Sequence, residues 1–209
     1  MQIAMVVYDR FTALDAVGPY EVLSRLPDAE VVFVAERPGP VRTDTGFLAV
    51  TADRALHEVT RPDIVVVAGG PGTLPQMENQ ALLEWLRAVD ATSTWTTSVC
   101  SGSLLLAAAG LLRGRRATSH WGALEVLEQF GAEPTGERVV TDGKYVTAAG
   151  VSAGIDMALT LVGALAGDEH AQTVQLLVEY DPQPPYDAGS PQKAPAHIVE
   201  AFHTRFSLT

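Results

Sequence analysis

The sequence predicts an α/β protein with an open, mostly parallel sheet and helices on both faces. Short runs of Val, Ile and Ala without charge recur along the chain, which is typical of strands buried on both faces. Segments with apolar residues three and four positions apart stand between these runs and predict helices. Because the two kinds of segment alternate, we expect helical crossovers between parallel strands.

Seven segments of extended character justify the predicted strands. Two of them surround turn signals: 41–51 has Thr45-Gly46 at its centre, which predicts a small hairpin or edge strand, and 139–147 contains Asp142-Gly143, which predicts a second hairpin. A further short strand is predicted at 117–119. The apolar runs that predict the remaining strands are 3–8, 30–35, 63–68 and 94–97.

Helices are predicted wherever the apolar spacing is helical. Pro19 lies inside the first, and because an internal proline costs a helix about 3 kcal/mol, we expect a kink at Gly18-Pro19. Residues 181–195 are proline-rich and are predicted to be irregular, packing over a neighbour or a second subunit. The predicted helices are 14–26, 79–89, 104–109, 123–130, 148 to about 165, 168–179 and 196–206.

Length, composition and charge restrict the classes of protein to which this chain can belong. The 209 residues predict one domain spanning 1–209, and 47% hydrophobic residues indicate a sizeable core. A formal net charge of -11 argues against nucleic acid and anionic membrane as partners. The single cysteine permits no internal disulfide, and no basic region precedes the first apolar run, so we expect a first strand rather than a signal peptide, and a cytoplasmic protein.

The only cysteine, Cys100, stands between a predicted strand and a predicted helix, flanked by the small residues Ser98, Ser101 and Gly102. A thiol at a helix N-terminus is expected to have a lowered pKa, and the thiolate is a nucleophile. The N–H groups of Ser101 and Gly102 are then expected to face an anion beside the sulfur. The alternative is a small buried core residue at a turn that does no chemistry.

Two other segments are expected at the same edge of the sheet, because working groups gather at the carboxyl ends of parallel strands. Asp15 is either a solvated or helix-capping acid, or a carboxyl that shares a proton with Cys100 and serves as a general acid. The segment Gly69-Gly70-Pro71-Gly72 fails the spacing of a dinucleotide fingerprint. It is either a tight turn or an anion site made from the Gly70 N–H opposite the Ser101 N–H.

His120 follows another short predicted strand and leads into a helix. It is either a partner of Cys100 in a nucleophile pair or a cap of the following helix. The other four histidines are scattered without metal-ligand spacing, so no metal site is predicted.

Motifs along nearly the whole chain resemble the DJ-1/PfpI superfamily and, within it, the isonitrile (isocyanide) hydratases. The tail from Glu179-Tyr180-Asp181-Pro182 to Gly189-Ser190-Pro191 carries the similarity to the hydratases. The segments that carry the superfamily resemblance are Leu14–Val22, Ala68–Gly72, Ser98–Gly102, Arg116–Trp121 and Ala153–Asp156.

The resemblance implies a flavodoxin-like three-layer sandwich, a homodimer and no cofactor. It also implies a hydro-lyase in which Cys100 attacks with Asp15 as its acid partner and forms a thioimidate with an isocyanide. The expected catalytic residues are Cys100, Asp15 and Ser101. The expected substrate-binding residues are Gly70, Tyr20, His120, Trp121 and Val151, in a small apolar pocket.

Some residues of this chain differ from those at the matching positions of other family members, and these differences change the expected activity. Protease-like members have a histidine after the cysteine, whereas this chain has Ser101, which argues against peptidase activity. The hydratases carry a threonine there, of which Ser101 keeps the hydroxyl, and Asp15 replaces the glutamate of many DJ-1-type members. The alternatives are a glyoxalase- or deglycase-like enzyme acting on α-oxoaldehydes, and a ligand or redox sensor resembling the sensory half of AraC-type regulators.

Overall fold

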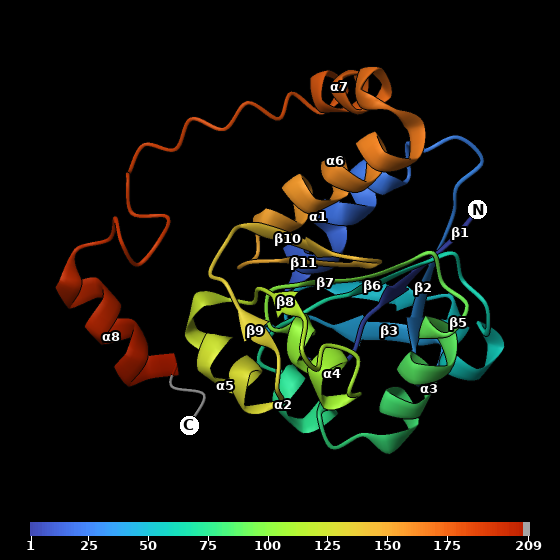
Figure 1. Cartoon of the computed structure of the whole chain (residues 1–209), viewed down its shortest axis with the longest axis horizontal. Coiled ribbons are helices and arrows are strands. Elements are labelled where there is room, and N and C mark those ends of the chain that lie inside the picture. The colour runs from blue at the N-terminus through green and yellow to red at the C-terminus, as the bar shows by residue number, and fades with distance from the viewer. Residues whose placement is uncertain (207–209) are drawn as a thin grey trace.

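A seven-stranded sheet in the order β10-β11-β7-β6-β1-β2-β5 forms the centre of the computed structural model, which describes residues 1–206 (Figure 1). All neighbouring pairs are parallel except β10 with β11. Its strands are β1 (Gln2–Val6), β2 (Glu30–Ala35), β5 (Arg54–Ala55), β6 (Ile64–Val67), β7 (Trp95–Val99), β10 (Val139–Asp142) and β11 (Tyr145–Ala148). Two small pairs lie outside it: antiparallel β3 (Gly39–Arg42) with β4 (Ala49–Ala52), and parallel β8 (Arg116–Ala117) with β9 (Glu133–Pro134).

Helices cover both faces of this sheet (Figure 1). One face carries α1 (Ala13–Leu23), α6 (Ala153–Ala166) and α7 (Asp168–Leu177). The other carries α2 (Thr73–Gln76), α3 (Gln80–Asp90), α4 (Gly102–Ala108) and α5 (Leu124–Gln129). The 3-10 turns are η1 (Leu56–Glu58) and η2 (Trp121–Ala123), and the last helix, α8 (Ala196–Phe206), packs against η2, where the rings of Trp121 and Phe202 are 4.4 Å apart. The arrangement confirms the predicted flavodoxin-like α/β sandwich.

Alternation along β1 explains why two cores form. Ile3 and Met5 are buried with α1 and α6, whereas Ala4 and Val6 are buried with α3 and α4. Successive side chains of a strand point to opposite faces, so an uninterrupted apolar run supplies both layers.

Both predicted hairpins are confirmed, since β3 pairs with β4 and β10 with β11. The first helix differs from the expectation: α1 continues through Pro19 and ends at Leu23 rather than near Leu26. Pro19 is buried against α6, where a Cβ on Gly154 would lie 3.0 Å from its ring, and this packing offsets the missing N–H. The short elements β5, η1, α2 and β9 were not predicted, because two to four residues carry no detectable periodicity.

The expected domain also includes residues 207–209, which lie outside the described part of the chain. Among residues 1–206, no helix combines the length and the apolar composition that crossing a bilayer requires.

Candidate active site

The order of the strands places a crevice at the carboxyl ends of β1 and β6. The chain runs from β1 outward through β2 and then returns to β6 on the other side of β1. At such a switch point the two connections diverge and leave room for a site. The loops after β6 and the adjacent β7, which carry Gly69 and Cys100, meet here with the start of α1, which follows β1 and carries Asp15.

Cys100 lies on a sharp turn between β7 and α4, with a φ of 58°. A left-handed conformation costs a non-glycine residue on the order of 1 kcal/mol, so the surroundings must hold it. Its N–H is shared between the carbonyls of Ala148 (3.0 Å) and Ala149 (3.1 Å). Its carbonyl accepts from the hydroxyls of Ser103 (3.2 Å) and Ser119 (3.1 Å). Both polar groups of the strained peptide are therefore anchored.

Asp15 is the third residue of α1 and is fully buried. Its Oδ2 accepts a 2.9 Å hydrogen bond from the Gly69 N–H, and the Gly69 carbonyl accepts from the Thr12 N–H at 2.8 Å. Both backbone polar groups of Gly69 therefore bind the loop after β6 to the start of α1. The other oxygen, Oδ1, is buried without a hydrogen-bond partner of ordinary geometry among the described residues, although the nearby Cys100 thiol lowers the pKa of this carboxyl.

Gly69 is required by this packing. A Cβ there would lie 2.6 Å from the backbone nitrogen of Ser101 and 2.8 Å from that of Gly102, both backbone atoms that cannot yield. The next N–H, of Gly70, donates to Ser101 Oγ at 2.9 Å. The expected anion site made from the Gly70 N–H is therefore not formed, because the serine hydroxyl already occupies that donor.

The electrostatics of the thiol differ from the expectation. Burial, and then the charge of Asp15, raise the pKa of Cys100 to about 12, although the thiol was expected to have a lowered pKa. The helix that follows has only seven residues, and its N-terminus does not outweigh the loss of solvent. Burial likewise raises the pKa of Asp15 to about 7, with Gly69 and Cys100 acting in the opposite direction. The two groups form a buried pair that does not ionise together.

Two backbone N–H groups, of Ser101 and Val151, approach the sulfur and lower the pKa of the thiol against these larger effects. Val151 was expected only as apolar lining. Its φ of 40° is strained for a β-branched residue, and it turns the N–H toward Cys100 just before α6 begins. No sequence pattern identifies such a donor, because a backbone N–H belongs to every residue type except proline.

His120, Trp121 and Val151 line one pocket, of about 310 Å³. Ser119, which bonds the Cys100 carbonyl, lies on the same wall, so the pocket adjoins the thiol without Cys100 itself lining it. His120 acts as a cap, since its Nδ1 accepts from the Gly122 N–H at 3.2 Å, and burial lowers the pKa of the imidazole. Further residues of this pocket include Arg138 and the tail segment 189–192.

Tyr20 is not in this pocket, contrary to the expectation. It lies five residues after Asp15 in α1, which turns it roughly 140° around the helix axis. Its ring packs against Phe33 with the centroids 5.6 Å apart, and 37% of its surface is exposed. Gly70 does not line the pocket either.

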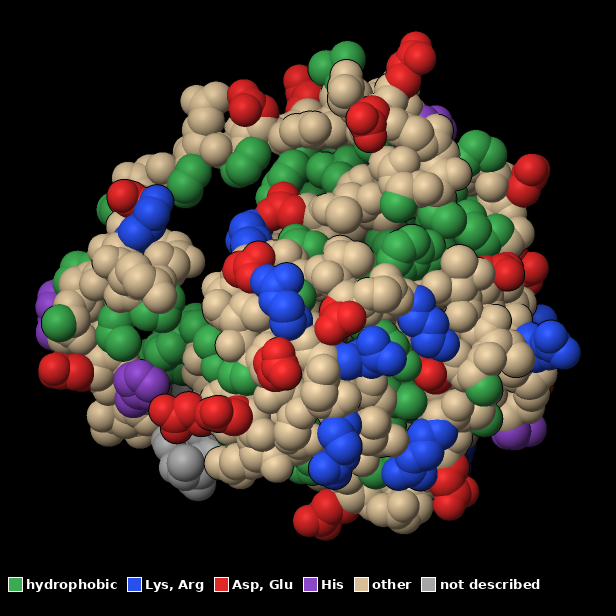
Figure 2. All heavy atoms as spheres, viewed as in Figure 1, with side chains coloured by type: hydrophobic (Ala, Val, Ile, Leu, Met, Phe, Trp, Pro, Cys, Tyr) green, Lys and Arg blue, Asp and Glu red, His purple; other side chains and the backbone are tan. Residues whose placement is uncertain are grey.

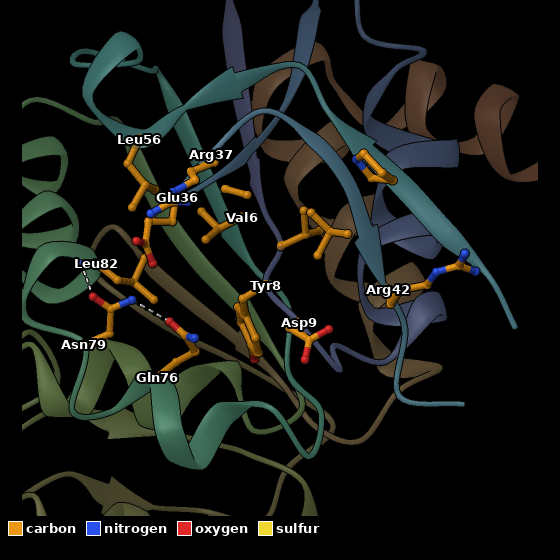
Figure 3. A pocket seen from close by; sticks show the side chains of 14 residues that line it. Val6, Tyr8, Asp9, Glu36, Arg37, Arg42, Leu56, Gln76, Asn79 and Leu82 are labelled. Atoms are coloured by element: carbon orange, nitrogen blue, oxygen red, sulfur yellow. Dashed lines mark hydrogen bonds between the residues drawn. The ribbon is translucent and has the colours of Figure 1, made fainter. Parts of the chain in front are cut away.

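A second pocket, of about 370 Å³, lies at the carboxyl ends of β1 and β2 (Figure 3). Tyr8 stands in its wall between Asp9 and Gln76, with Glu36 and Arg37 across the cavity. Cys100, Asp15 and Ser101 line neither pocket, but the smaller one adjoins the thiol through Ser119 and Val151. Within residues 1–206 no group of three or more His, Cys, Asp or Glu side chains could hold a metal ion.

Comparison with known proteins places this geometry in context. Residues 1–164 match the model of the DJ-1/PfpI family. An isonitrile hydratase of Pseudomonas putida is 43% identical over 205 residues, which cover 98% of this chain and 90% of the hydratase. The transcriptional regulator CdhR of Pseudomonas aeruginosa is 36% identical over 138 residues, which cover 65% of this chain and 40% of the regulator.

A solved structure of a THiJ/PfpI family protein from Pseudomonas syringae is 41% identical to this chain. It covers 99% of this chain, and this chain covers 87% of it, with a TM-score of 0.95.

Proposed function

The chain belongs to the DJ-1/PfpI family, and we propose that it is an isonitrile hydratase, which adds water to an organic isocyanide to give an N-substituted formamide. The observation that carries this proposal is the buried pair of Asp15 and Cys100. The pair has no histidine at the elbow, and Ser101 follows the cysteine instead. Similarity to a hydratase over nearly the whole chain supports the same activity.

The first half of the proposed reaction joins the sulfur to the substrate. Because the pKa of the thiol exceeds that of Asp15, the resting pair holds its proton on the sulfur at neutral pH. As the sulfur attacks the terminal carbon of the isocyanide, the thiol proton passes to Asp15 Oδ1, the carboxyl oxygen without another partner. The carboxyl then delivers that proton to the same carbon, which leaves a neutral thioimidate. One group thus acts as base and acid within one step.

The second half releases the product. Water adds to the thioimidate carbon as Asp15 accepts one proton from it and delivers that proton to the nitrogen, which leaves a tetrahedral carbon bearing a hydroxyl, an N–H and the sulfur. The carbon–sulfur bond then breaks as the hydroxyl oxygen becomes the carbonyl, its proton passes through Asp15 to the sulfur, and the formamide leaves. The N–H groups of Ser101 and Val151 are positioned to stabilise negative charge on the sulfur during attack and departure. A pocket with Trp121 and Val151 in its wall suits a small, nearly apolar substrate.

The test is formamide production from a simple alkyl isocyanide, followed by NMR. Wild type is compared with Cys100→Ala and Asp15→Asn, and with Asp28→Asn as a control that changes an exposed carboxyl. We expect turnover in wild type and the control and none above background in the other two. Full activity in folded Cys100→Ala would disprove the mechanism.

A change of substrate separates the alternative functions. A glyoxalase- or deglycase-like enzyme would act on methylglyoxal through the same thiol, so wild type without formamide production is assayed on methylglyoxal next. Binding of a small ligand without turnover of either compound would instead favour a sensor.

We also infer that a second copy of the chain packs against the tail. After α7 the chain leaves the body, and an opening separates it from the two layers (Figures 1 and 2). Leu176, Leu177 and Tyr186 of this region are 78%, 64% and 81% exposed. Three large apolar side chains this exposed in one region of the chain favour an interaction surface, and a symmetric homodimer is the commonest arrangement that covers one.

Light scattering after size-exclusion chromatography tests this inference. We expect a dimer for wild type and a monomer for the double variant Leu176→Asp/Leu177→Asp. Leu48→Asp, which changes an exposed leucine of the β3–β4 hairpin, serves as the control and should remain dimeric. A monomeric wild type would overturn the inference.

A further inference from the structure

Three buried hydroxyl groups form a row that leads away from the thiol. Tyr8 OH lies 2.7 Å from the Ala68 carbonyl oxygen and 2.8 Å from Thr73 Oγ1. Thr73 Oγ1 in turn lies 2.8 Å from Ser101 Oγ, and the Ser101 side chain, next to Cys100 in the sequence, lowers the pKa of its thiol. The three side chains come from the end of β1, the start of α2 and the start of α4, and none exposes more than 7% of its surface.

When Tyr8 donates to the Ala68 carbonyl, donor and acceptor counts give the row one direction. A carbonyl only accepts, so the single proton of Tyr8 points at Ala68. The Tyr8 oxygen must then accept from Thr73, which uses the only hydroxyl proton of that residue. Ser101 consequently donates to Thr73, since its other acceptor, the Gly70 carbonyl, is 3.4 Å away.

This direction leaves Ser101 with no proton for the sulfur. Its oxygen accepts from the Gly70 N–H, so in this direction of the row it can offer the sulfur only a lone pair. A lone pair there favours a protonated thiol. The Ser101 side chain lowers the pKa of the thiol, which requires the opposite direction, with the hydroxyl donating to the sulfur. If the three hydroxyls rotate together, Tyr8 donates to Thr73, Thr73 to Ser101 and Ser101 to the sulfur, and only the Ala68 carbonyl loses its donor. No proton changes its oxygen in this rotation.

We propose that Tyr8 and Thr73 are positioning residues that set the polarity of the Ser101 hydroxyl, holding it as an acceptor toward the resting thiol and releasing it as a donor when charge develops on the sulfur. The proposal deepens the role given to Ser101 beside the nucleophile and rests on the proposed function only for the use of that charge. The Tyr8 ring also forms part of the wall of the larger pocket (Figure 3), so the row ends beneath a cavity outside the reaction site.

Alkylation of Cys100 by iodoacetamide across a pH series measures the pKa of the thiol without any turnover, because the chain has one cysteine. We expect Tyr8→Phe to lower this pKa by about one unit, which is about tenfold faster alkylation at neutral pH. The reason is that Phe cannot accept a hydrogen bond, so Thr73 can donate its proton to Ser101 instead. Ser101 can then donate its own proton to the thiolate. Thr73→Val should act in the same direction, and Thr73→Ser should restore the wild-type value.

The double variant Tyr8→Phe/Ser101→Ala separates this account from loosened packing. Tyr8→Phe should have no further effect once Ser101 is Ala, because the row then no longer reaches the sulfur. The other groups that act on the sulfur, Asp15 of α1 and the backbone N–H groups of Ser101 and Val151, remain in every variant.

An unchanged or raised pKa in Tyr8→Phe would overturn the proposal, and so would an effect that persists without Ser101. If Tyr8→Phe does not fold, the comparison of Thr73→Val with Thr73→Ser decides in its place. A failure of the isocyanide assay leaves this measurement intact, so the two proposals fail separately.

Discussion

Replacing Asp15 by Asn is expected to make the protein more stable at neutral pH while abolishing its activity. Asn keeps the shape of the side chain and an oxygen for the Gly69 N–H, but it has no charge to bury. Burial raises the pKa of Asp15 from 3.8 to about 7. The folded state therefore holds a proton that the unfolded chain releases at lower pH.

The size of the effect follows from linkage. A carboxyl with a raised folded pKa contributes its full stability below its unfolded pKa, and that contribution is lost as the pH rises to the folded value. Each pH unit between the two values costs wild type about 1.4 kcal/mol. Over the interval from 3.8 to about 7, the loss is about 4 kcal/mol, and it ends above the folded pKa.

Urea denaturation of wild type and Asp15→Asn at several pH values between about 4 and 8 measures this difference. The difference in free energy of unfolding, in favour of the variant, should increase steadily with pH and then level off near pH 7. Subtracting one curve from the other removes the contribution of the remaining titratable groups. Asp28→Asn, at an exposed position, should stay within about 0.5 kcal/mol of wild type throughout. A difference between Asp15→Asn and wild type that does not vary with pH would refute the reasoning.

The geometry makes two further predictions. Gly69→Ala should lower the free energy of unfolding by about 1–3 kcal/mol, because its Cβ would lie 2.6 Å from the backbone nitrogen of Ser101; Gly189→Ala, with open space around it, should have little effect. Both are checked by urea denaturation, and equal losses would contradict the prediction. Trp121→Ala should raise KM for an isocyanide about tenfold, whereas Tyr20→Leu should leave kcat and KM within about twofold of wild type. Steady-state kinetics decide this, and a KM effect at Tyr20 would restore it to the pocket.

Local signals in the sequence were sufficient for most of the fold. The run Ile64–Val67 has no polar residue, so it could only be a fully buried strand. Asp142-Gly143 placed a turn between β10 and β11. Short elements such as α2 gave no signal, although α2 begins at Thr73, which supplies the middle hydroxyl of the row. The pKa of Cys100 was predicted with the wrong sign, since burial is a property of the whole fold.

The sequence by itself determined the class of the protein and the position of the elbow, because apolar period, turn residues and a lone cysteine between small residues are local properties. Only the tertiary structure decided which groups surround the sulfur. Asp15 and Gly69 are 54 residues apart and are hydrogen-bonded, and Thr73 is 28 residues from Ser101. The structure also excluded Tyr20 from the pocket and added the Val151 N–H to the thiol. These residues become neighbours because the parallel strands that precede them end side by side, and the spacing of residues along the chain does not reveal which strands are adjacent.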